Sequence, residues 1–384
     1  MNPGKDAWIG VLGGGQLGRM LSLSARKMGI QVLAWTGGDR SGAASTADRI
    51  IDKSFGDPSA LEDFSQSVEA TTVEFENLPV ETLEQVEERL PLRPGSHAVS
   101  ICQHREREKK FLSENGFSCA NFSLAHDLQS FTDGVRQIGT PLIVKTAEFG
   151  YDGKGQIRLS DQLSQNEIEQ AWKTFEGGRV VIEERINLET ELSVLVARDY
   201  EGNTVYYDPV ENIHRNHILD ISIAPARISP EIQNKASETA LEIAHALKYV
   251  GMLAVEFFVS SDGRLLVNEL APRPHNSGHH TIDACHCSQF EQQARATAGI
   301  PLGSTQLISP VIMINLLGDL WQDSLTPPDW SEVLAMKGTA LHLYGKREAR
   351  PGRKMGHINI LGDSVEDCLK KARSIRNQLD LPAF

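Results

Sequence analysis

The chain has 384 residues, of which 51 are acidic and 38 basic, and its formal net charge is -13. This charge argues against a surface that binds nucleic acid or an anionic membrane, although a local basic pocket is compatible with it. The sequence lacks the run of roughly 18 apolar residues that a membrane-spanning helix requires, and its five cysteines are scattered. We therefore expect a soluble, reduced, cytoplasmic protein with two or three domains.

The first hundred residues alternate between predicted strands and helices. Apolar runs predict strands at residues 8–12, 31–35, 49–52 and 71–76. Helical spacing and helix-start signals predict helices at residues 16–28, 58–67 and 80–90. This order is typical of an α/β domain with a parallel sheet.

A glycine-rich turn joins the first predicted strand to the first helix. Its sequence, VLGGGQLGRM, places Gly13, Gly15 and Gly18 in a G-x-G-x-x-G pattern, and we expect the free N–H groups of the helix N-terminus to bind an anion. A nicotinamide-dependent enzyme usually carries an acid at the end of the next strand, where this chain has Trp35 and Thr36. The turn therefore predicts an anion site without identifying the ligand.

A second glycine-rich loop follows a polar segment, HAVSICQHREREKKFLSENG, which we expect to form one helix ending at Gly116. The loop, TAEFGYDGKG, lies between the predicted strands PLIVK and QIRL. It lacks the G-K-[ST] sequence and the following helix of a Walker A motif. Such a loop can cover phosphates with its N–H groups while Lys145 adds a point charge, but an ordinary glycine turn fits the same pattern.

Residues 191–270 contain a run of predicted antiparallel strands, interrupted by one helix at residues 229–248. Within this run, Asp262-Gly263 predicts a two-residue hairpin loop. That loop would place Glu256 and Glu269 directly opposite each other, with their side-chain roots about 5 Å apart. The face that they share is expected to be apolar, because it would also carry Ala254, Phe258, Leu265 and Val267.

Two carboxylates in this arrangement repel each other, and the sequence leaves three ways to resolve the repulsion. One carboxyl can hold a proton and serve as a general acid or base. A hard cation can bind between the two, with Asn268 beside them. In the third case both side chains lie on a solvated face. A magnesium site with two carboxylates usually takes its other ligands from water and phosphates, which favours a nucleotide ligand.

Taken together, the motifs resemble those of one known family. The segments GGGQLGRM, VEFENLP, GYDGKGQ, NELAPRPHNSGHHT and YGKREARPGRKMGHI are similar to motifs of the 5-(carboxyamino)imidazole ribonucleotide synthases, in the ATP-grasp superfamily, and the match covers nearly the whole chain. The resemblance implies an α/β fold (α+β overall) of three domains. These are an N-terminal Rossmann-like, parallel-sheet domain at residues 1–100, an ATP-grasp domain at 101–300 with a lid at about 118–190, and a small C-terminal domain at 301–384.

The resemblance also implies a reaction. Family members use ATP and bicarbonate to carboxylate 5-aminoimidazole ribonucleotide by way of carboxyphosphate, and they release ADP and phosphate. This is a step of de novo purine biosynthesis. The family further implies magnesium as cofactor, a homodimer, small-molecule substrates as partners, and neither nucleic acid nor membrane.

By the same resemblance, Glu256 and Glu269 would hold magnesium, and further residues would bind ATP. Glu183 to Ile186 would contact adenine largely through backbone groups, and Glu191 would accept from the ribose hydroxyls. The full set expected to bind ATP is Arg105, Lys145, Gly150, Tyr151, Asp152, Gly153, Lys154, Gly155, Gln156, Glu183, Glu184, Arg185, Ile186, Glu191, His214, Asn268 and Glu269.

The ribonucleotide would bind at the glycine turn, with Glu74 against the aminoimidazole, and Lys346 and Arg353 would bind its phosphate. The set expected to bind this substrate is Gln16, Leu17, Glu74, Tyr151, Lys154, Asn276, Lys346, Arg353 and Lys354. Bicarbonate or carboxyphosphate would contact a planar guanidinium and a histidine able to move protons near neutral pH. The set expected to be catalytic is Arg273, His275, Asn276, Lys346, Asp152 and Lys154.

Three alternative functions remain at this stage. An ATP-grasp enzyme that formylates glycinamide ribonucleotide shares the fold, but it resembles this chain less at Gln16 and Asn276, where it carries Glu and Asp. A Rossmann-type oxidoreductase would explain the glycine turn but not the facing glutamates. A non-catalytic nucleotide-binding regulator would be expected to lack a key residue, whereas Lys145, Glu256 and Glu269 are all present.

Overall fold

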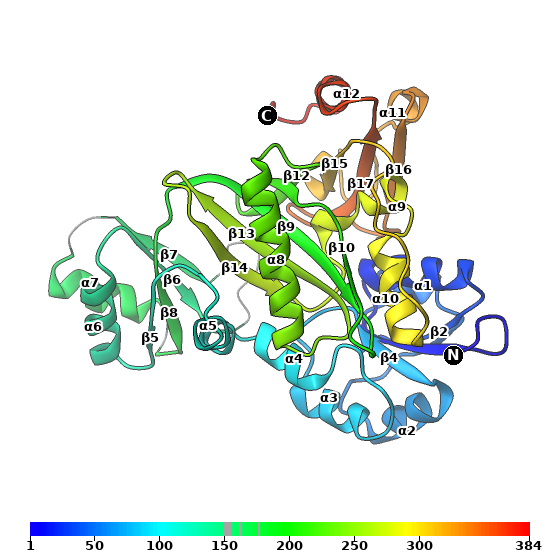
Figure 1. The fold of residues 1–384 in the computed structure, drawn as a ribbon, viewed down its shortest axis with the longest axis horizontal. Helices are drawn as coiled ribbons and strands as arrows, with labels where there is room; N and C mark the ends of the chain where they lie inside the picture. The colour runs from blue at the N-terminus through cyan, green and yellow to red at the C-terminus, as the bar shows by residue number, and fades with distance from the viewer. Residues whose placement is uncertain (149–154, 161–162, 176) are drawn as a thin grey trace.

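The structure is a computed structural model that describes residues 1–148, 155–160, 163–175 and 177–384. Three sheets organise these residues: a parallel sheet of four strands in the order β3-β2-β1-β4, a second four-stranded sheet in the order β5-β8-β6-β7, and a nine-stranded sheet. Figure 1 shows the second sheet at one end of the molecule, with the first sheet and the C-terminal strands at the other. No helix among the described residues is both long and apolar enough to cross a membrane.

The N-terminal unit has the predicted alternation of strands and helices. Its parallel strands are β1 (Trp8–Leu12), β2 (Gln31–Trp35), β3 (Arg49–Ile51) and β4 (Ala70–Val73), and its helices are α1 (Gln16–Lys27), α2 (Pro58–Ser67) and α3 (Val80–Glu87). The fourth strand is shorter than residues 71–76 because the chain leaves the sheet after Val73. The next residue, Glu74, therefore lies at the carboxyl edge of the sheet, where open α/β sheets bind ligands.

The single helix expected before Gly116 is wrong. The segment forms two helices, α4 (Ser96–Cys102) and α5 (Arg105–Glu114), because His104 has an extended backbone and is buried. The break gives Arg105 the first position of a new helix, and its N–H donates to the Ala147 carbonyl at 2.9 Å. A residue expected on a continuous helix thus lies beside the end of strand β6.

The second sheet lies in the region where the sequence resemblance implies a lid, and it is called the lid sheet below. It contains β5 (Phe122–Ala125), β6 (Leu142–Thr146), β7 (Gln156–Leu159) and β8 (Val180–Glu184), covered by α6 (Leu128–Ile138) and α7 (Gln165–Lys173). Phe131 of α6 and Ile182 of β8 are fully buried in its core. Lys145 pairs with Gln156 across β6 and β7, so the two expected strands flank the glycine-rich loop.

The nine-stranded sheet joins the middle and the end of the chain. From residue 188 to 271 it contains β9 (Leu188–Arg198), β10 (Thr204–Tyr206), β11 (Val210–Arg215), β12 (Ile218–Ala224), β13 (Gly251–Ser260) and β14 (Leu265–Ala271), with α8 (Pro230–Ala246) across one face. The segment TVYYDPV, expected as one strand, divides between β10 and β11. The C-terminal strands β15 (Val311–Leu317), β16 (Thr339–Leu343) and β17 (Lys354–Leu361) continue the same sheet, because β15 pairs with β12.

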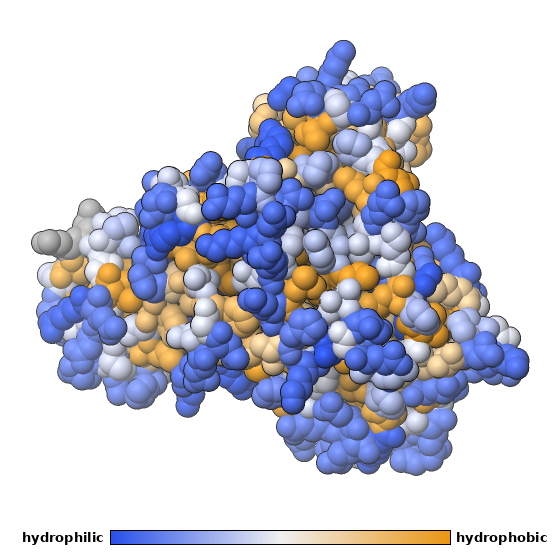
Figure 2. Space-filling model, viewed as in Figure 1, coloured by the Kyte–Doolittle hydropathy of each residue, from blue (hydrophilic) through white to orange (hydrophobic). Residues whose placement is uncertain are grey.

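The remaining helices surround this sheet. They are α9 (Thr281–Ala284), α10 (Gln289–Ala298), α11 (Ser331–Ala335) and α12 (Val365–Gln378). Phe290 and Ala294 of α10 share a core cluster with Leu21 and Ala25 of α1. Helix α10 therefore packs against the N-terminal unit. On the face drawn in Figure 2, polar residues cover most of the outer parts, and apolar residues gather nearer the middle.

The hairpin between β13 and β14 differs from the expected one but gives the same facing pair. Its loop has three residues, since Ser260 rather than Ser261 pairs with Arg264, with Ser260 N–H donating to the Arg264 carbonyl at 2.9 Å. A β-bulge then adds Asn268 to β14, so that Glu256 again lies opposite Glu269. The expected two-residue loop is wrong, and the bulge cancels the one-residue error.

The bulge also changes which residues share the glutamates' face. Leu265 and Val267 lie on the opposite face, in the core cluster that includes Val255 of β13 and Ala240 of α8. Leu266, which pairs with Phe258, takes their place beside the glutamates. The expectation that Leu265 and Val267 share a face with the glutamates is therefore wrong. Between the loop and the bulge the register differs by one residue from the expected one, and such a shift moves each side chain to the other face.

Gly263 closes this hairpin with φ +83, and no heavy atom lies within 4 Å of the position that a Cβ would take. We expect Gly263→Ala to lower the free energy of unfolding by about 1 kcal/mol, because an L-residue is strained in this conformation. Denaturant unfolding would measure the change. Gly56→Ala is the matched control, since Gly56 has equal space around it and no positive φ. Equal stability of the two variants would contradict the positive φ at Gly263.

Candidate active site

A cavity of about 560 Å³ opens where the three units meet. Its walls come from the glycine turn, the end of β4, the start of α5, the lid strands, the large sheet and the segment after β16. A larger cavity of about 900 Å³ shares Gln16, Lys346 and Lys354 with it and extends along the C-terminal strands. Most of the described residues expected to bind ATP or substrate therefore line one continuous space.

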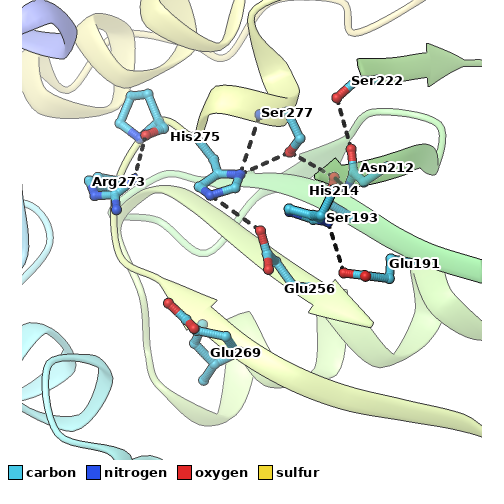
Figure 3. Close-up of polar contacts among 12 residues, drawn as sticks. Glu191, Ser193, Asn212, His214, Ser222, Glu256, Glu269, Arg273, His275 and Ser277 are labelled. Carbon is cyan, nitrogen blue, oxygen red and sulfur yellow. Dashed lines mark hydrogen bonds and ion pairs between the residues drawn. The ribbon is translucent and has the colours of Figure 1, made fainter. Parts of the chain in front are cut away.

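Glu256 and Glu269 project into the first cavity from neighbouring strands (Figure 3). Burial, and then the charge of Glu269, raise the pKa of Glu256 to about 7. The expected repulsion between these carboxylates is therefore present in the structure. With Asn268 also in the cavity wall, the pair offers hard oxygen ligands of the kind that magnesium prefers.

A third carboxylate, which the sequence analysis missed, lies behind this pair. Glu108 of α5 is 1% exposed, and its Oε1 accepts from the Leu270 N–H at 2.6 Å. Burial, and then the charge of Glu269, raise its pKa to about 8. In the sequence Glu108 belongs to REREKK, a pattern typical of a solvent-exposed charged helix face. The break at His104, which starts α5 at Arg105, is what places Glu108 on the buried side of that helix.

Three cations pair with Glu269 and with a further acid, Glu183. Arg105 Nη1 lies 3.5 Å from Glu269 Oε2, while Lys145 Nζ and Lys109 Nζ lie 2.7 Å and 3.4 Å from the two oxygens of Glu183. Burial alone would raise the pKa of Glu183, but the two lysines hold it at about 2. The Glu183 carboxylate thus fixes Lys145, and the backbone of Glu183 lies between β5 and β6 in the lid sheet, so its expected contact with adenine stays a prediction.

The segment after β8 forms the far end of the cavity, where Glu184, Ile186 and Glu191 line the wall. The Glu184 carboxylate is itself held by the Asn121 N–H at 3.0 Å and by Arg264 at 3.2 Å. The Arg185 N–H donates to the Pro141 carbonyl at 3.1 Å, and its side chain is not among the lining groups. These contacts hold the segment against the lid sheet.

Glu191 and His214 form an ion pair in the same wall, with 3.0 Å between Oε2 and Nδ1. Burial would lower the pKa of His214, but the hydrogen bond and charge of Glu191 raise it above its ordinary value. Both residues thus lie where the sequence analysis expects the nucleotide. The carboxylate of Glu191 can still accept from a ligand hydroxyl through its second oxygen.

The glycine turn differs from its expectation in one respect. Its N–H groups are not free, because the buried Glu74 carboxylate accepts from Gly15 N at 2.6 Å and from Leu17 N at 3.1 Å. A Cβ on Gly13 or Gly15 would lie 2.5 Å or 2.4 Å from Glu74 oxygens, so these glycines leave room for the carboxylate. The helix N-terminus therefore binds an internal anion, and Gln16 and Leu17 line the cavity next to it.

Arg273 makes a pair that the sequence analysis also missed. Its Nε and Nη2 donate to the two oxygens of Glu76 at 2.5 Å and 3.0 Å, in bidentate geometry. Burial would lower the pKa of Arg273, but Glu76 raises it. Glu76 belongs to VEFENLP, and its partner is 197 residues away along the chain, so no local signal connects them.

Asn276 and His275 lie beside this pair. Asn276 is 6% exposed and lines the cavity, and neither its amide nitrogen nor its amide oxygen has a hydrogen-bond partner within the part of the chain that the structure describes. His275 Nε2 lies 3.3 Å from Glu256 Oε1. Burial, and then Arg273, lower the pKa of His275 well below its ordinary value, so the ring is neutral at neutral pH.

Cations gather where the two cavities meet. Lys346 Nζ donates to the Lys354 carbonyl at 2.8 Å and to the Gln16 side chain, and Arg353 Nη1 donates to the Glu348 carbonyl at 2.7 Å. Burial, and then Arg353, lower the pKa of Lys346 to about 8. An anion bound here would relieve this repulsion.

Of the expected residues, Gly150, Tyr151, Asp152, Gly153 and Lys154 lie outside the described residues, whereas Gly155 and Gln156 lie within them.

Family models match three successive parts of the chain. A ribonucleotide synthetase preATP-grasp domain matches residues 7–103, an ATP-grasp domain matches 110–290, and a phosphoribosylaminoimidazole carboxylase C-terminal domain matches 311–371. The N5-carboxyaminoimidazole ribonucleotide synthase of Bacillus subtilis is 40% identical over 365 residues, covering 95% of this chain and 94% of the relative. That of Brucella melitensis is 41% identical over 358 residues, covering 93% and 96%.

Solved structures agree with these matches. An ADP complex of N5-carboxyaminoimidazole ribonucleotide synthetase superposes with a TM-score of 0.91 at 40% identity, covering 99% of this chain and 98% of that one. A complex of the Aspergillus clavatus synthase with ADP and 5-aminoimidazole ribonucleotide gives a TM-score of 0.87 at 29% identity, covering 99% of each chain. The fold expected from the sequence, a parallel-sheet N-terminal domain followed by an ATP-grasp domain and a small C-terminal domain, is confirmed.

The facing acids, the cations around them and these matches decide between the functions considered from the sequence. They exclude the oxidoreductase, the regulator and the formylating ligase. The protein is an ATP-dependent carbon–nitrogen ligase that carboxylates 5-aminoimidazole ribonucleotide to the N5-carboxyamino product in purine biosynthesis. The chain therefore belongs to the N5-carboxyaminoimidazole ribonucleotide synthase family of ATP-grasp enzymes.

Proposed function

We propose that ATP and the ribonucleotide bind at the two ends of the cavity, that bicarbonate binds between them, and that the facing acids bind the metal. ATP lies between the lid sheet and the nine-stranded sheet, with its phosphates toward Lys145 and Arg105. Bicarbonate lies beside Arg273 and Asn276, and the ribonucleotide lies between the glycine turn and Lys346. The facing glutamates support this most directly, because they lie between the cations of the lid and the cations of the C-terminal strands.

Glu256 and Glu269 are the residues that would hold magnesium, with Asn268 beside them. Their donor set fits the ion, because two hard carboxylates lie opposite each other and the pKa of Glu256 is raised in the absence of a neutralising charge. Magnesium supplies charge neutralisation to the phosphoryl group in transfer.

The side chains around the metal site orient the reacting anions. Glu183 holds Lys145 at 2.7 Å, which aims a single charge at the phosphates of ATP. Arg273, fixed by Glu76, and the buried Asn276 amide bind bicarbonate and the carboxyphosphate formed from it. Carboxyphosphate is destroyed by water, so a cavity closed by these groups protects it.

At the substrate end, Lys346, Arg353 and Lys354 bind the phosphate of the ribonucleotide, and Gln16 and Leu17 contact the rest of it. Glu74 shapes this site through the glycine turn, because its carboxylate already occupies the helix N-terminus. The phosphate therefore needs other cations, and burial and Arg353 lower the pKa of Lys346, a shift that a bound phosphate would oppose.

We also propose a cytoplasmic homodimer with domain limits at residues 1–100, 101–300 and 301–384. The sequence resemblance supports the dimer and the compartment. The change from the N-terminal sheet to α4 and α5, and the start of β15 at Val311, support the limits.

The protein is expected to hydrolyse ATP only slowly until 5-aminoimidazole ribonucleotide and bicarbonate are added. Lys346→Ala should raise KM for the ribonucleotide by at least about 10-fold and change KM for ATP by less than about twofold, because a charged contact to phosphate is lost. A coupled ADP assay measures both. Lys337→Ala, at an exposed lysine, is the control. Equal effects on the two KM values would contradict a role at the substrate phosphate.

Glu269→Gln should lower kcat by about 100-fold or more and raise the magnesium concentration needed for half-maximal rate, since even outer partners of metal ligands cost about 10- to 100-fold. Thermal unfolding should remain close to wild type. Glu238→Gln, on the exposed face of α8, is the matched control. An unchanged magnesium requirement would exclude Glu269 as a ligand.

The charge of Lys346 predicts a pH dependence. Because its pKa is lowered to about 8, the amine is charged below that pH and loses its charge above it. We expect kcat/KM for the ribonucleotide to fall as the pH rises through about 8, since this ratio reports ionisations of the free enzyme. In Lys346→Arg the guanidinium stays charged, so the fall should be absent. The same fall in both proteins would assign it to another group.

A further inference from the structure

A chain of buried polar side chains crosses the nine-stranded sheet and ends at His275 (Figure 3). The Ser222 hydroxyl donates to Asn212 Oδ1 at 2.8 Å, and Asn212 Nδ2 donates to Ser193 Oγ at 3.0 Å. The Ser193 hydroxyl donates to Ser277 Oγ at 2.7 Å. All four residues are at most 4% exposed, so the chain is shielded from solvent.

The strand register explains how these residues come together. Asn212 of β11 lies directly opposite Ser222 of β12, and Ser193 of β9 lies directly opposite Glu256 of β13. Directly opposed residues point to the same face, so the chain occupies the face of the sheet that carries the two glutamates. Polar groups on a buried face are costly unless they are hydrogen-bonded, and here each links to the next.

The end of the chain selects one tautomer of His275. The Ser277 N–H donates to Nδ1 at 3.4 Å, and the Ser277 hydroxyl lies 2.9 Å from the same atom. Since Nδ1 accepts, the proton of a neutral ring is on Nε2, which faces Glu256 Oε1 at 3.3 Å. The Ser193 hydroxyl donates to Ser277 Oγ, which leaves the Ser277 proton for Nδ1.

In the opposite tautomer the Ser277 hydroxyl would lose Nδ1 as its acceptor, and it could find another acceptor among these residues only if every link reversed. A proton on Nδ1 would face the Ser277 N–H, and the Ser277 hydroxyl would have to donate to Ser193 instead. Asn212 would then have to present its oxygen to Ser193 and its nitrogen to Ser222. An amide has one donor end and one acceptor end, so Asn212 is the residue whose orientation sets the direction of the whole chain.

We propose that Ser193, Asn212 and Ser222 are positioning residues that hold His275 in the tautomer with its proton on Nε2, pointing to Glu256 and the reacting anions. The inference rests on the proposed function of the cavity and on the catalytic role that the sequence resemblance implies for His275. It adds three residues, on β9, β11 and β12, that make no contact with a substrate in that assignment.

The test is to compare Ser193→Ala and Asn212→Asp with the wild-type full-length protein without magnesium. Ser193→Ala breaks the chain, and Asn212→Asp replaces the directing donor with an acceptor. Nitrogen-15 NMR of histidine-labelled protein, with the His275 signal assigned from its loss in His275→Gln, reports the tautomer. We expect the wild type to show the Nε2–H form and both variants to show a mixture or the Nδ1–H form.

Kinetics provide the second readout. We expect kcat to fall about 10-fold in Ser193→Ala, with KM for ATP changed by less than about twofold, as for partners that orient a site residue. Thr132→Val, which removes an equally buried hydroxyl from α6 in the lid, is the matched control and should retain the wild-type tautomer and rate. If a variant does not fold, Ser222→Ala at the far end of the chain should give a smaller change in the same direction.

The outcomes separate this inference from the function on which it rests. Retention of a pure Nε2–H tautomer in both variants would overturn the inference, whatever the rates. A changed tautomer with reduced kcat would support it. A changed tautomer with wild-type kcat would support the inference that these hydrogen bonds orient the ring, and it would refute instead the catalytic role expected for His275.

Discussion

Two carboxylates that face each other across neighbouring strands determine how the charges of this site are arranged. Glu256 and Glu269 repel each other, and Glu108 adds a third acid behind them. Cations from other parts of the chain lie around this negative centre, with Arg105 near Glu269. Such a cluster is unfavourable by itself, and a divalent cation together with a bound polyphosphate balances it. The stability of the site is therefore coupled to its ligands.

The surrounding ion pairs serve mainly to direct particular groups. Glu183 holds Lys145, and Glu76 holds Arg273, each through a carboxylate that is itself at the edge of the cavity or buried. Paired cations of this kind lose little further freedom when an anion arrives, so less of the binding free energy is spent on ordering them. Glu74 acts similarly on the backbone, because it fixes the glycine turn from inside.

Much of the fold could be predicted from local patterns, whereas the pairings at the site could not. The strands and helices of the first ninety residues follow from apolar periodicity, and their limits agree within a few residues for β1, β2 and α2. The prediction that Glu256 lies opposite Glu269 is correct although the predicted loop is one residue too short, because the bulge at Asn268 shifts the register back by one residue. Glu76 and Glu108 were missed, because their partners are more than 150 residues away and no periodicity links such positions.

The last strands of the chain continue the sheet that carries the two facing glutamates. Strand β15 pairs with β12 through four consecutive residues, and β17 and β16 follow. Lys354, the first residue of β17, thus belongs to the same hydrogen-bonded sheet as the glutamates, and Lys346 and Arg353 lie in the segment that joins β16 to β17. A shortened protein that stopped before residue 311 would leave β12 as an open edge, with unpaired backbone groups ready to recruit strands from other molecules. The C-terminal segment therefore covers the edge of β12 as well as supplying part of the cavity wall.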